Sequence, residues 1–387
     1  MGEVRSTAVA GVGLRQYKRG TAPMPERALL VAAIVDACEE AGLDPRDVDG
    51  FATYGDDHNE PLKLMGDLGT RELCWSSTVF GGGGGGIAGA FGQAMAAIRS
   101  GQASAVVVYR ALAQDSSGRL ADAVMAHHLN AHLVGAGLTA PAQICALRAR
   151  RLFEYHGVPP SAVEAFVRAV QHHGERNPAA VSYGRSFDSE AYQGARWIAE
   201  PFRLFDCSRE NDGAGALLLV SSDRARHLDK LPVHVLGVAT GAEKGWGDLL
   251  ENDDDDQYAT AGFRSVARRL WRSTGLSPAD VDVAQVYENF SAQGVAALID
   301  HGFCDYDSVS DFVRYENLVA PDGALPVNTA GGNLHEGFVH GIGLAVEAVR
   351  QLRGESANPV PGAKTCLLTG GPAAPLVSSA LFGNEQP

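Results

Sequence analysis

Apolar residues between positions 79 and 101 recur at intervals of three and four, directly behind a run of six glycines, Gly81 to Gly86. This spacing places the apolar side chains on one face of a helix. Gly101 ends the predicted helix. The β-branched run ASAVVVYRAL that follows is typical of a buried strand. The chain therefore predicts a glycine loop, a helix and a strand in direct succession.

Other stretches show the same alternation of strand and helix patterns. Residues 6–13 predict a strand that ends in glycines, and residues 25–41 predict an amphipathic helix. Further helices are expected at 140–157 and 161–178, and a buried strand at 214–221. Strands that alternate with helices indicate an α/β fold.

The chain also contains an internal repeat. GLDPRDVDGF at 42–51 and GLSPADVDVA at 275–284 each follow a predicted helix and precede a strand. Residues 331–354 form a second glycine loop that continues into a helix, and a strand follows at 366–371. We therefore expect a duplicated unit, with halves 1–228 and 229–387 and an insertion over about 113–200 in the first half. Packing of the halves would bring both glycine loops to one shared site.

Composition narrows the possible partners. The net charge of -14 argues against nucleic acid or an anionic membrane as a partner. No apolar run reaches the ~18 residues that cross a bilayer, and the N-terminus has no signal-peptide pattern. The six cysteines form no C-x-x-C pair, which fits reduced thiols in a cytoplasmic protein better than disulfides or a zinc site. His127, His128 and His132 share no spacing that demands a metal, so we expect none.

The glycine loop leaves two interpretations open at this point. A glycine-rich helix N-terminus presents backbone N–H groups that can bind an anion, a thioester oxygen or a developing oxyanion. The same glycines can simply allow close backbone packing.

Several longer stretches together resemble the thiolase superfamily, in its lipid-transfer-protein (sterol-carrier-protein-thiolase-like) branch. They are the glycine loop and helix at 81–101, VVVYRAL at 106–112, PFRLFDCSRENDGAGA at 201–216, VYENFSAQ at 286–293 and the loop and helix at 331–354. The resemblance implies duplicated βαβαβ halves in a five-layer αβαβα sandwich. It also implies a homodimer and an acyl-CoA substrate, with coenzyme A as part of that substrate and no separate cofactor.

The sequence departs from thiolases where their chemistry takes place. Gly84 stands where a thiolase has its nucleophilic cysteine, and Phe338 aligns with the histidine of the G-H-P motif. Tyr287 aligns with the Asn or His before the acidic residue of the N-E-A-F or H-D-C-F loop. The last glycine loop, LLTGGP, also lacks a thiol. Acyl transfer through a cysteine is therefore not expected.

Members of this branch that lack these cysteines include actinobacterial retro-aldolases of steroid side-chain degradation. The resemblance implies cleavage of a β-hydroxyacyl-CoA, a 17-hydroxy steroid 20-carboxyl-CoA, to a 17-ketosteroid and propionyl-CoA. It also implies a complex with a MaoC-like hydratase that carries an OB-fold domain. Two alternatives stay open: a degenerate thiolase that binds acyl-CoA or lipid or scaffolds a partner enzyme, and a thiolase-like enzyme acting on a non-steroid acyl-CoA.

Retro-aldol cleavage needs a base, an acid and donors for the thioester enolate. Tyr287 is the first candidate for acid/base work, although it also fits a core tyrosine with a satisfied hydroxyl. In the related aldolases the loop around position 338 usually reads G-Y-V-H-G, whereas this chain has a phenylalanine there. The complete set of expected site residues is Tyr287, His340 and His335 for catalysis, with Gly83, Gly84, Gly370, Gly371 and Phe338 against the substrate.

Overall fold

The computed structural model describes residues 6–113, 131–243 and 258–385. Its first half confirms the predicted succession of strands and helices. The elements are β1 (Thr7–Lys18), α1 (Glu26–Ala41), β2 (Gly50–Tyr54), α2 (Pro61–Leu68), β3 (Trp75–Val79), α3 (Ile87–Ser100), β4 (Ala105–Leu112), β7 (Asn211–Ser221) and α9 (Ser222–Ala225). Strand β1 runs five residues beyond its predicted end, because it pairs with β7 along its whole length, from Thr7 opposite Ser221 to Lys18 opposite Asn211.

The second half repeats this order. It contains β8 (Val233–Gly241), α10 (Arg264–Thr274), β9 (Val283–Gln285), α11 (Ser291–Asp300), α12 (Val309–Phe312), α13 (Tyr315–Leu318), the π-helical turn η4 (Gly332–Glu336), α14 (Ile342–Arg353), β10 (Thr365–Gly370) and β11 (Val377–Gly383). Short 3₁₀ turns, η1 (Pro45–Asp47) and η3 (Pro278–Asp280), stand at equivalent places before β2 and β9. These turns are the two copies of the repeated GL-x-P-x-DVD sequence.

Sheet topology confirms the duplication. The strand order is β3-β2-β4-β7-β1-β8-β11-β10-β9. In each half the outer strands pair in parallel, β2 with β4 and β9 with β10, and the inner strands pair antiparallel, β7 with β1 and β11 with β8. A single parallel bridge from Ala284 to Val327 occupies the place that β3 has beside β2. Among the described strands, the two half-sheets join through the short β1–β8 pairing.

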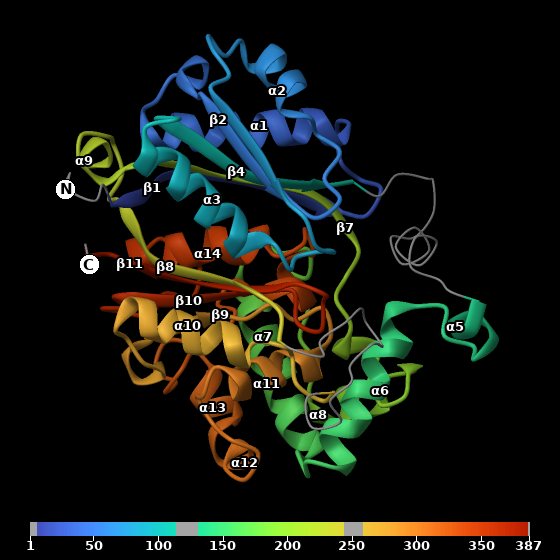
Figure 1. The fold of residues 1–387 in the computed structure, drawn as a ribbon. Coiled ribbons are helices and arrows are strands. Elements are labelled where there is room, and N and C mark those ends of the chain that lie inside the picture. The colour runs from blue at the N-terminus through green and yellow to red at the C-terminus, as the bar shows by residue number, and fades with distance from the viewer. Residues whose placement is uncertain (1–5, 114–130, 244–257, 386–387) are drawn as a thin grey trace.

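The elements stack in five layers, as Figure 1 shows. Helix α1 covers the outer face of the first half-sheet, α3 and α14 lie between the two half-sheets, and α10 covers the outer face of the second. The αβαβα sandwich expected from the sequence is therefore confirmed. The layers also explain why α3 and α14 are so apolar, since each must pack against two sheets.

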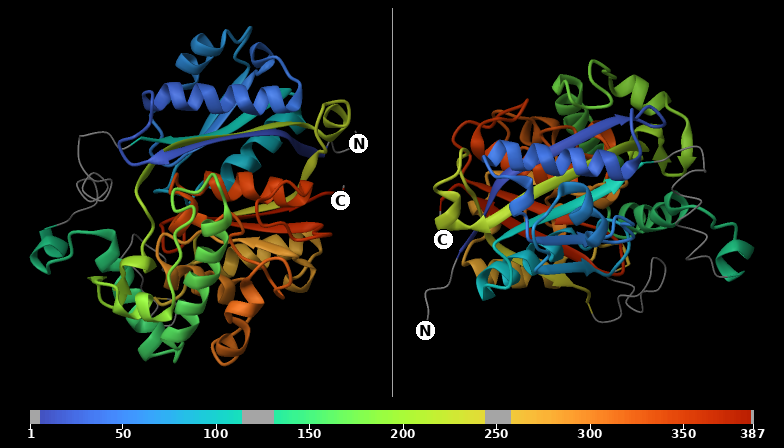
Figure 2. Two further views of the ribbon diagram at one scale, coloured as in Figure 1. Left: turned by 180° about the vertical axis from the view of Figure 1, so that it is seen from behind. Right: turned by 90° about the horizontal axis from the view of Figure 1, so that it is seen from above.

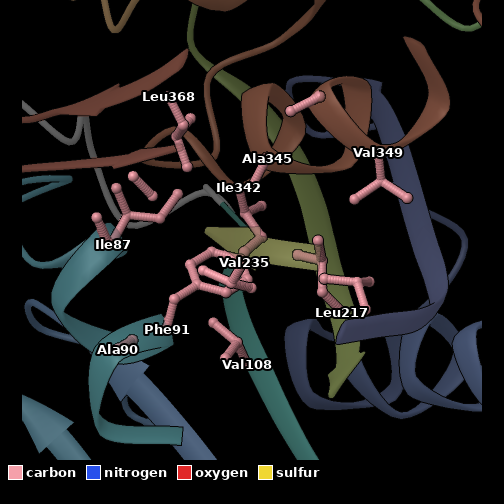
Figure 3. Close-up of a cluster of buried hydrophobic side chains, with 14 of the residues drawn as sticks. Ile87, Ala90, Phe91, Val108, Leu217, Val235, Ile342, Ala345, Val349 and Leu368 are labelled. Carbon is pink, nitrogen blue, oxygen red and sulfur yellow. The ribbon is translucent and has the colours of Figure 1, made fainter. Parts of the chain in front are cut away.

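The central layer holds the core that joins the halves. Ile87 and Phe91 of α3 and Ile342 of α14 are fully buried and point toward one another between the strands (Figure 3). The stripe predicted for residues 87–98 belongs to this cluster. Two further buried clusters lie under the outer helices, one beneath α1 and one beneath α10.

The insertion leaves the first half and packs on the second. It contains α5 (Ala131–Gly135), α6 (Pro141–Glu154), α7 (Pro160–Arg176), α8 (Ser189–Gly194), the hairpin β5 (Trp197–Ala199) and β6 (Phe202–Arg203), and the turn η2 (Leu204–Asp206). Figures 1 and 2 show it beside α11 and below the central layer. Helix α7 contacts η4 and α11, so the insertion supports the second glycine loop. None of the described helices is both long and apolar enough to span a bilayer.

Candidate functional site

The glycine loops of the two halves meet with almost no space between their backbones. A Cβ on Gly371 would lie 2.2 Å from the Cα of Gly85, and one on Gly370 would lie 2.7 Å from the carbonyl oxygen of Gly84. A Cβ on Gly84 would lie 2.9 Å from the carbonyl oxygen of His340. The shared site expected from the repeat is therefore present, and close packing is one reason for these glycines. Gly83 differs, because a Cβ there would meet nothing within 4 Å.

Tyr287 fills the centre of this site. It follows β9, and its backbone N–H donates to Thr369 Oγ1 at 2.9 Å. A Cβ on Gly84 would lie only 2.0 Å from Tyr287 Cε2, and one on Gly341 would lie 2.7 Å from Cδ2. The ring therefore occupies the space beside position 84 and leaves none for a side chain on that glycine.

Burial raises the pKa of the Tyr287 hydroxyl, although the positive charge of Arg110 and a hydrogen bond from the Gly84 backbone oppose the shift. The phenol is consequently neutral at physiological pH. Gly84 was expected to offer its N–H to the substrate, and it stays a proposed substrate-binding residue beside the Tyr287 ring.

His340 lies in the loop that precedes α14, next to Gly341, which packs on the ring of Tyr287. The backbone of His340 has a φ of 48°, which is unusual for a residue other than glycine. The carbonyl oxygen of His340 accepts a hydrogen bond from the hydroxyl of Tyr54 at 3.0 Å. The ring atom Nδ1 of His340 lies 2.7 Å from Nη2 of Arg110. Burial and the neighbouring Arg110 charge hold the pKa of His340 well below its usual range. The imidazole is therefore neutral.

Arg110 was not among the site residues predicted from the sequence. It is the single charged residue of β4, a strand buried along its whole length. Its Nη1 donates to the Tyr54 carbonyl oxygen at 3.0 Å and lies 3.7 Å from Asp57 Oδ2. A charged residue inside the apolar run VVVYRAL indicates a buried polar site, because burying a charge is costly unless it is paired with a hydrogen-bonding or charged partner.

Phe338 lies between the two candidate catalytic groups. Its ring meets Tyr287 edge-on at a centroid distance of 6.2 Å and His340 at 5.1 Å. Its backbone N–H donates to Asn211 Oδ1, which fixes the loop against β7. The position expected to contact substrate thus presents a purely apolar face.

His335 lies apart from this group. Its ring contacts Phe187 at 5.7 Å, its carbonyl oxygen accepts Ser182 Oγ, and a Cβ on Gly174 would lie 2.6 Å from its Cβ. Burial and the charge of Arg209 lower the pKa of His335 to about 3. The structure therefore places this residue against the insertion, whereas Tyr287, Phe338 and His340 share one site.

Two buried carboxyl groups support the loop from behind. Glu288 receives the side chain of Asn333 at 3.3 Å, and a Cβ on Gly332 would lie 1.9 Å from its Oε1. Burial raises the pKa of Glu288 well above its usual range, and burial together with the charge of Glu347 raises the pKa of Glu336 to about 8. Both carboxyl groups are therefore largely neutral near neutral pH.

The described residues contain no group of three His, Cys, Asp or Glu side chains that could hold a metal ion. His127 and His128 lie outside the described residues, and the side chain of His132 is likewise not described. The chemistry available is that of a neutral phenol, a neutral imidazole and backbone donors in a dry site. Such a set can move a proton and stabilise an oxyanion, but it offers no nucleophilic thiol.

Comparison with known proteins gives consistent matches. Residues 249–380 match the family described as thiolase C-terminal domain-like. The chain is 35% identical to the 17-hydroxy-3-oxo-4-pregnene-20-carboxyl-CoA lyase of Mycobacterium tuberculosis, over 95% of this chain and 97% of that protein. It is 34% identical to the steroid side-chain-cleaving aldolase of Thermomonospora curvata, over 98% of each.

Solved structures agree with these matches. The structure described as the Ltp2-ChsH2(DUF35) aldolase has a TM-score of 0.92 at 33% identity and covers the whole of both chains. Human mitochondrial 3-ketoacyl-CoA thiolase has a TM-score of 0.68 at 15% identity, which shows the same fold.

Proposed function

This chain belongs to the thiolase superfamily, in the group of the steroid side-chain-cleaving aldolases, and from that premise we propose that it cleaves a β-hydroxyacyl-CoA by a retro-aldol reaction. The proposed substrate is a 17-hydroxy steroid 20-carboxyl-CoA, and the proposed products are a 17-ketosteroid and propionyl-CoA. Relatives that align with nearly the whole chain carry this activity in their names. The observation that carries the proposal is the ring of Tyr287 in the space beside Gly84.

That arrangement separates the site from a thiolase. A thiolase forms an acyl-enzyme on a cysteine at the position of Gly84, and here neither the thiol nor the room for it exists. Cys366, in β10, is fully buried, and burial raises the pKa of its thiol well above the usual range. The reaction must therefore proceed without a covalent intermediate on these positions.

A retro-aldol step meets this requirement. The proton leaves the β-hydroxyl, the bond between the α and β carbons breaks, and the electron pair moves onto the thioester oxygen as an enolate. Protonation of the α carbon releases the shortened acyl-CoA. We assign both proton transfers to the Tyr287 hydroxyl as one coupled relay: the neutral phenol gives its own proton to the α carbon as it takes up the proton of the β-hydroxyl, so it ends the cycle in the state in which it began.

The remaining proposed site residues are backbone groups of the glycine loops and the side chains of Phe338, His340 and His335. Gly83 and the Gly370–Gly371 turn adjoin the site and are proposed to line the path of the thioester, and Phe338 gives an apolar surface for the acyl group. His335 stays a proposed site residue with an indirect role, through the loop that carries His340. Coenzyme A enters as part of the substrate, and no separate cofactor is proposed.

The proposed partners follow the resemblance. We propose a complex with a MaoC-like hydratase that carries an OB-fold domain. The solved structure named Ltp2-ChsH2(DUF35) aldolase supports a partner of the ChsH2(DUF35) kind. A homodimer is also proposed: β3 lies at the edge of the sheet, and Phe80 directly after it is 94% exposed. An open edge strand is ready to pair with another chain. Six free cysteines suit the proposed cytoplasmic location.

The test incubates the protein with a tertiary β-hydroxyacyl-CoA, with and without a co-purified hydratase, and measures free ketone and shortened acyl-CoA. Equal amounts of both products support the proposal. Tight acyl-CoA binding without cleavage would instead favour the degenerate, binding role, for which the missing hydroxyl at Phe338 is the specific argument. Faster turnover of a non-steroid thioester would favour the alternative of a thiolase-like enzyme acting on a non-steroid acyl-CoA.

A further inference from the structure

We propose that Arg110 is a positioning residue that holds His340 in one tautomer, with its proton on Nε2, so that the imidazole donates a hydrogen bond to the thioester oxygen. The identity of that oxygen rests on the proposed function. The tautomer itself rests on geometry alone.

Hydrogen-bond chemistry fixes the tautomer. A guanidinium carries only donors, and Nη2 of Arg110 lies 2.7 Å from Nδ1 of His340. Nδ1 must therefore accept this bond with its lone pair, which leaves the single proton of a neutral imidazole on Nε2. A second proton on Nδ1 would point at the guanidinium, so the ring is also barred from becoming an imidazolium.

Arg110 can hold this position because its other contacts are fixed. The guanidinium is buried, it donates to the Tyr54 carbonyl oxygen, and Asp57 stands 3.7 Å from Nη1. The Asp57 side chain is itself fully buried and accepts from the backbone N–H of Ala111 at 3.0 Å and of Asn59 at 2.8 Å. The positive charge is thus paired, and both partners are tied to the backbone.

His340 is constrained from its other end as well. Tyr54 donates its hydroxyl to the His340 carbonyl oxygen at 3.0 Å, and the next residue, Gly341, packs on the ring of Tyr287. Strands β2 and β4 of the first half therefore position a loop residue of the second half. Because Tyr287 contacts the same loop, the donor and the proton carrier keep a fixed relation to each other.

The consequence for the reaction is a division of roles. An Nε2–H that cannot be lost to a base or joined by a second proton is a donor at every pH at which the enzyme works. Such a donor stabilises the enolate without reorganisation as charge moves onto the thioester oxygen. His340 is therefore excluded as the base, and proton transfer is left to Tyr287.

The experiment combines ¹⁵N NMR of histidine-labelled protein with kinetics. Asp57→Asn keeps the contact between Arg110 and His340, whereas Asp57→Asn/Arg110→Met removes that contact without leaving a buried carboxylate unpaired. His340→Gln assigns the signal. We expect a neutral Nε2–H tautomer from pH 5.5 to 8 in the unaltered protein and in Asp57→Asn. In the double variant we expect a mixture of the two neutral tautomers. The pKa of the ring should rise because the Arg110 charge is gone, but it should stay below its usual value because the ring remains buried beside Phe338.

Kinetics add the functional readout. The double variant should lose about 100-fold in kcat relative to Asp57→Asn, with an acid limb in its pH profile that Asp57→Asn lacks, and with little change in acyl-CoA binding. An Nδ1–H tautomer in the unaltered protein, or a tautomer and pH profile in Asp57→Asn/Arg110→Met that match those of Asp57→Asn, overturns the proposal. Failure to cleave the steroid thioester would refute the proposed function and leave the NMR result to decide the role of Arg110.

Discussion

The ring of Tyr287 occupies the space that a side chain at position 84 would need: a Cβ on Gly84 would lie 2.0 Å from Tyr287 Cε2. The two residues come from opposite halves of the duplicated fold, and each explains the other. A glycine at 84 admits the phenol, and the phenol takes the place of a nucleophile. One pair of positions thus distinguishes this site from that of a thiolase with the same fold.

This relationship predicts strong coupling between the two positions. Gly84→Ala alone should lower the free energy of unfolding by about 1–3 kcal/mol, because the added methyl group overpacks the site. In a Tyr287→Ala background the same change should cost much less, with a coupling of at least about 1 kcal/mol. A residual cost is expected, since the His340 carbonyl oxygen also lies 2.9 Å from the added carbon. Chemical denaturation of the four proteins measures the cycle, and additive effects would contradict the packing argument.

Removal of the Tyr287 hydroxyl separates chemistry from packing. Tyr287→Phe keeps the ring between the two glycines and should lower kcat by about 100- to 10,000-fold, with at most about 1.5 kcal/mol of lost stability. Tyr192→Phe is a matched control: its buried hydroxyl donates to Asp206 at 2.7 Å within the insertion, so kcat should stay unchanged. Full activity of Tyr287→Phe in steady-state assays of ketone release would remove the role assigned to this residue.

The sequence predicted the fold and part of the site, for physical reasons. Periodicity located α1, α3, α6 and α7 because each buries one regular apolar stripe. Strand β11 (Val377–Gly383) was missed, because its pattern shows only against its partners β10 and β8.

The sequence likewise indicated some of the candidate site residues and missed another. Tyr287 was proposed from its alignment with a catalytic loop of thiolases, and His340 because it is a titratable side chain in the second glycine loop; the structure brings the loops that carry them together. Arg110 was missed, because its role depends on a contact with His340, 230 positions away in the chain. The spacing of His335 and His340 suggested two groups in one loop at one site. The π-helical turn η4 instead directs His335 toward Phe187. The local pattern of apolar and polar residues does not predict such a turn.

Adding a hydroxyl group at position 338 should increase the activity of the enzyme. Its ring meets both Tyr287 and His340 edge-on, so a hydroxyl on that ring adds a second acid/base group beside the first. Phe338→Tyr should raise kcat severalfold on the steroid thioester and leave its KM nearly unchanged. Steady-state kinetics on the purified variant measure this. A fall in kcat with intact folding would show that the apolar face at this position is itself required.

His340 should behave as a donor rather than as a base. His340→Ala should lower kcat by about 100- to 1,000-fold, the usual cost of losing one oxyanion donor. His340→Gln retains an N–H donor of similar reach and should recover at least about tenfold of that loss. A glutamine cannot act as a base, so equal inactivity of the two variants would argue for proton transfer by the imidazole. Acyl-CoA binding, measured by calorimetry, controls for collapse of the loop.

Glu336 predicts how stability depends on pH. Its carboxyl group is buried beside α14, its Oε1 has no hydrogen-bond partner among the described residues, and burial with the charge of Glu347 raises its pKa from 4.5 to about 8. The folded protein therefore holds a proton that the unfolded chain releases near pH 4.5. The stability that this proton contributes is full below that pH and is lost as the pH rises toward about 8.

The contribution of Glu336 to stability is best measured between pH 6.5 and 8. Below this window, His335, whose pKa is lowered to about 3, destabilises the fold as the pH falls and opposes the effect of Glu336. Asp300, with a pKa of about 6, completes its titration in the lower part of this window and is present in both proteins. Within the window, the free energy of unfolding should fall with pH less steeply in Glu336→Gln than in the unaltered protein, by up to about 1.4 kcal/mol per pH unit. Glu288 is present in both proteins and cancels in the comparison, whereas the charge of Glu347 is coupled to that of Glu336, so the difference between the slopes reports this pair. Urea denaturation at several pH values measures the two slopes, and parallel slopes would show that Glu336 is already ionised in the folded state.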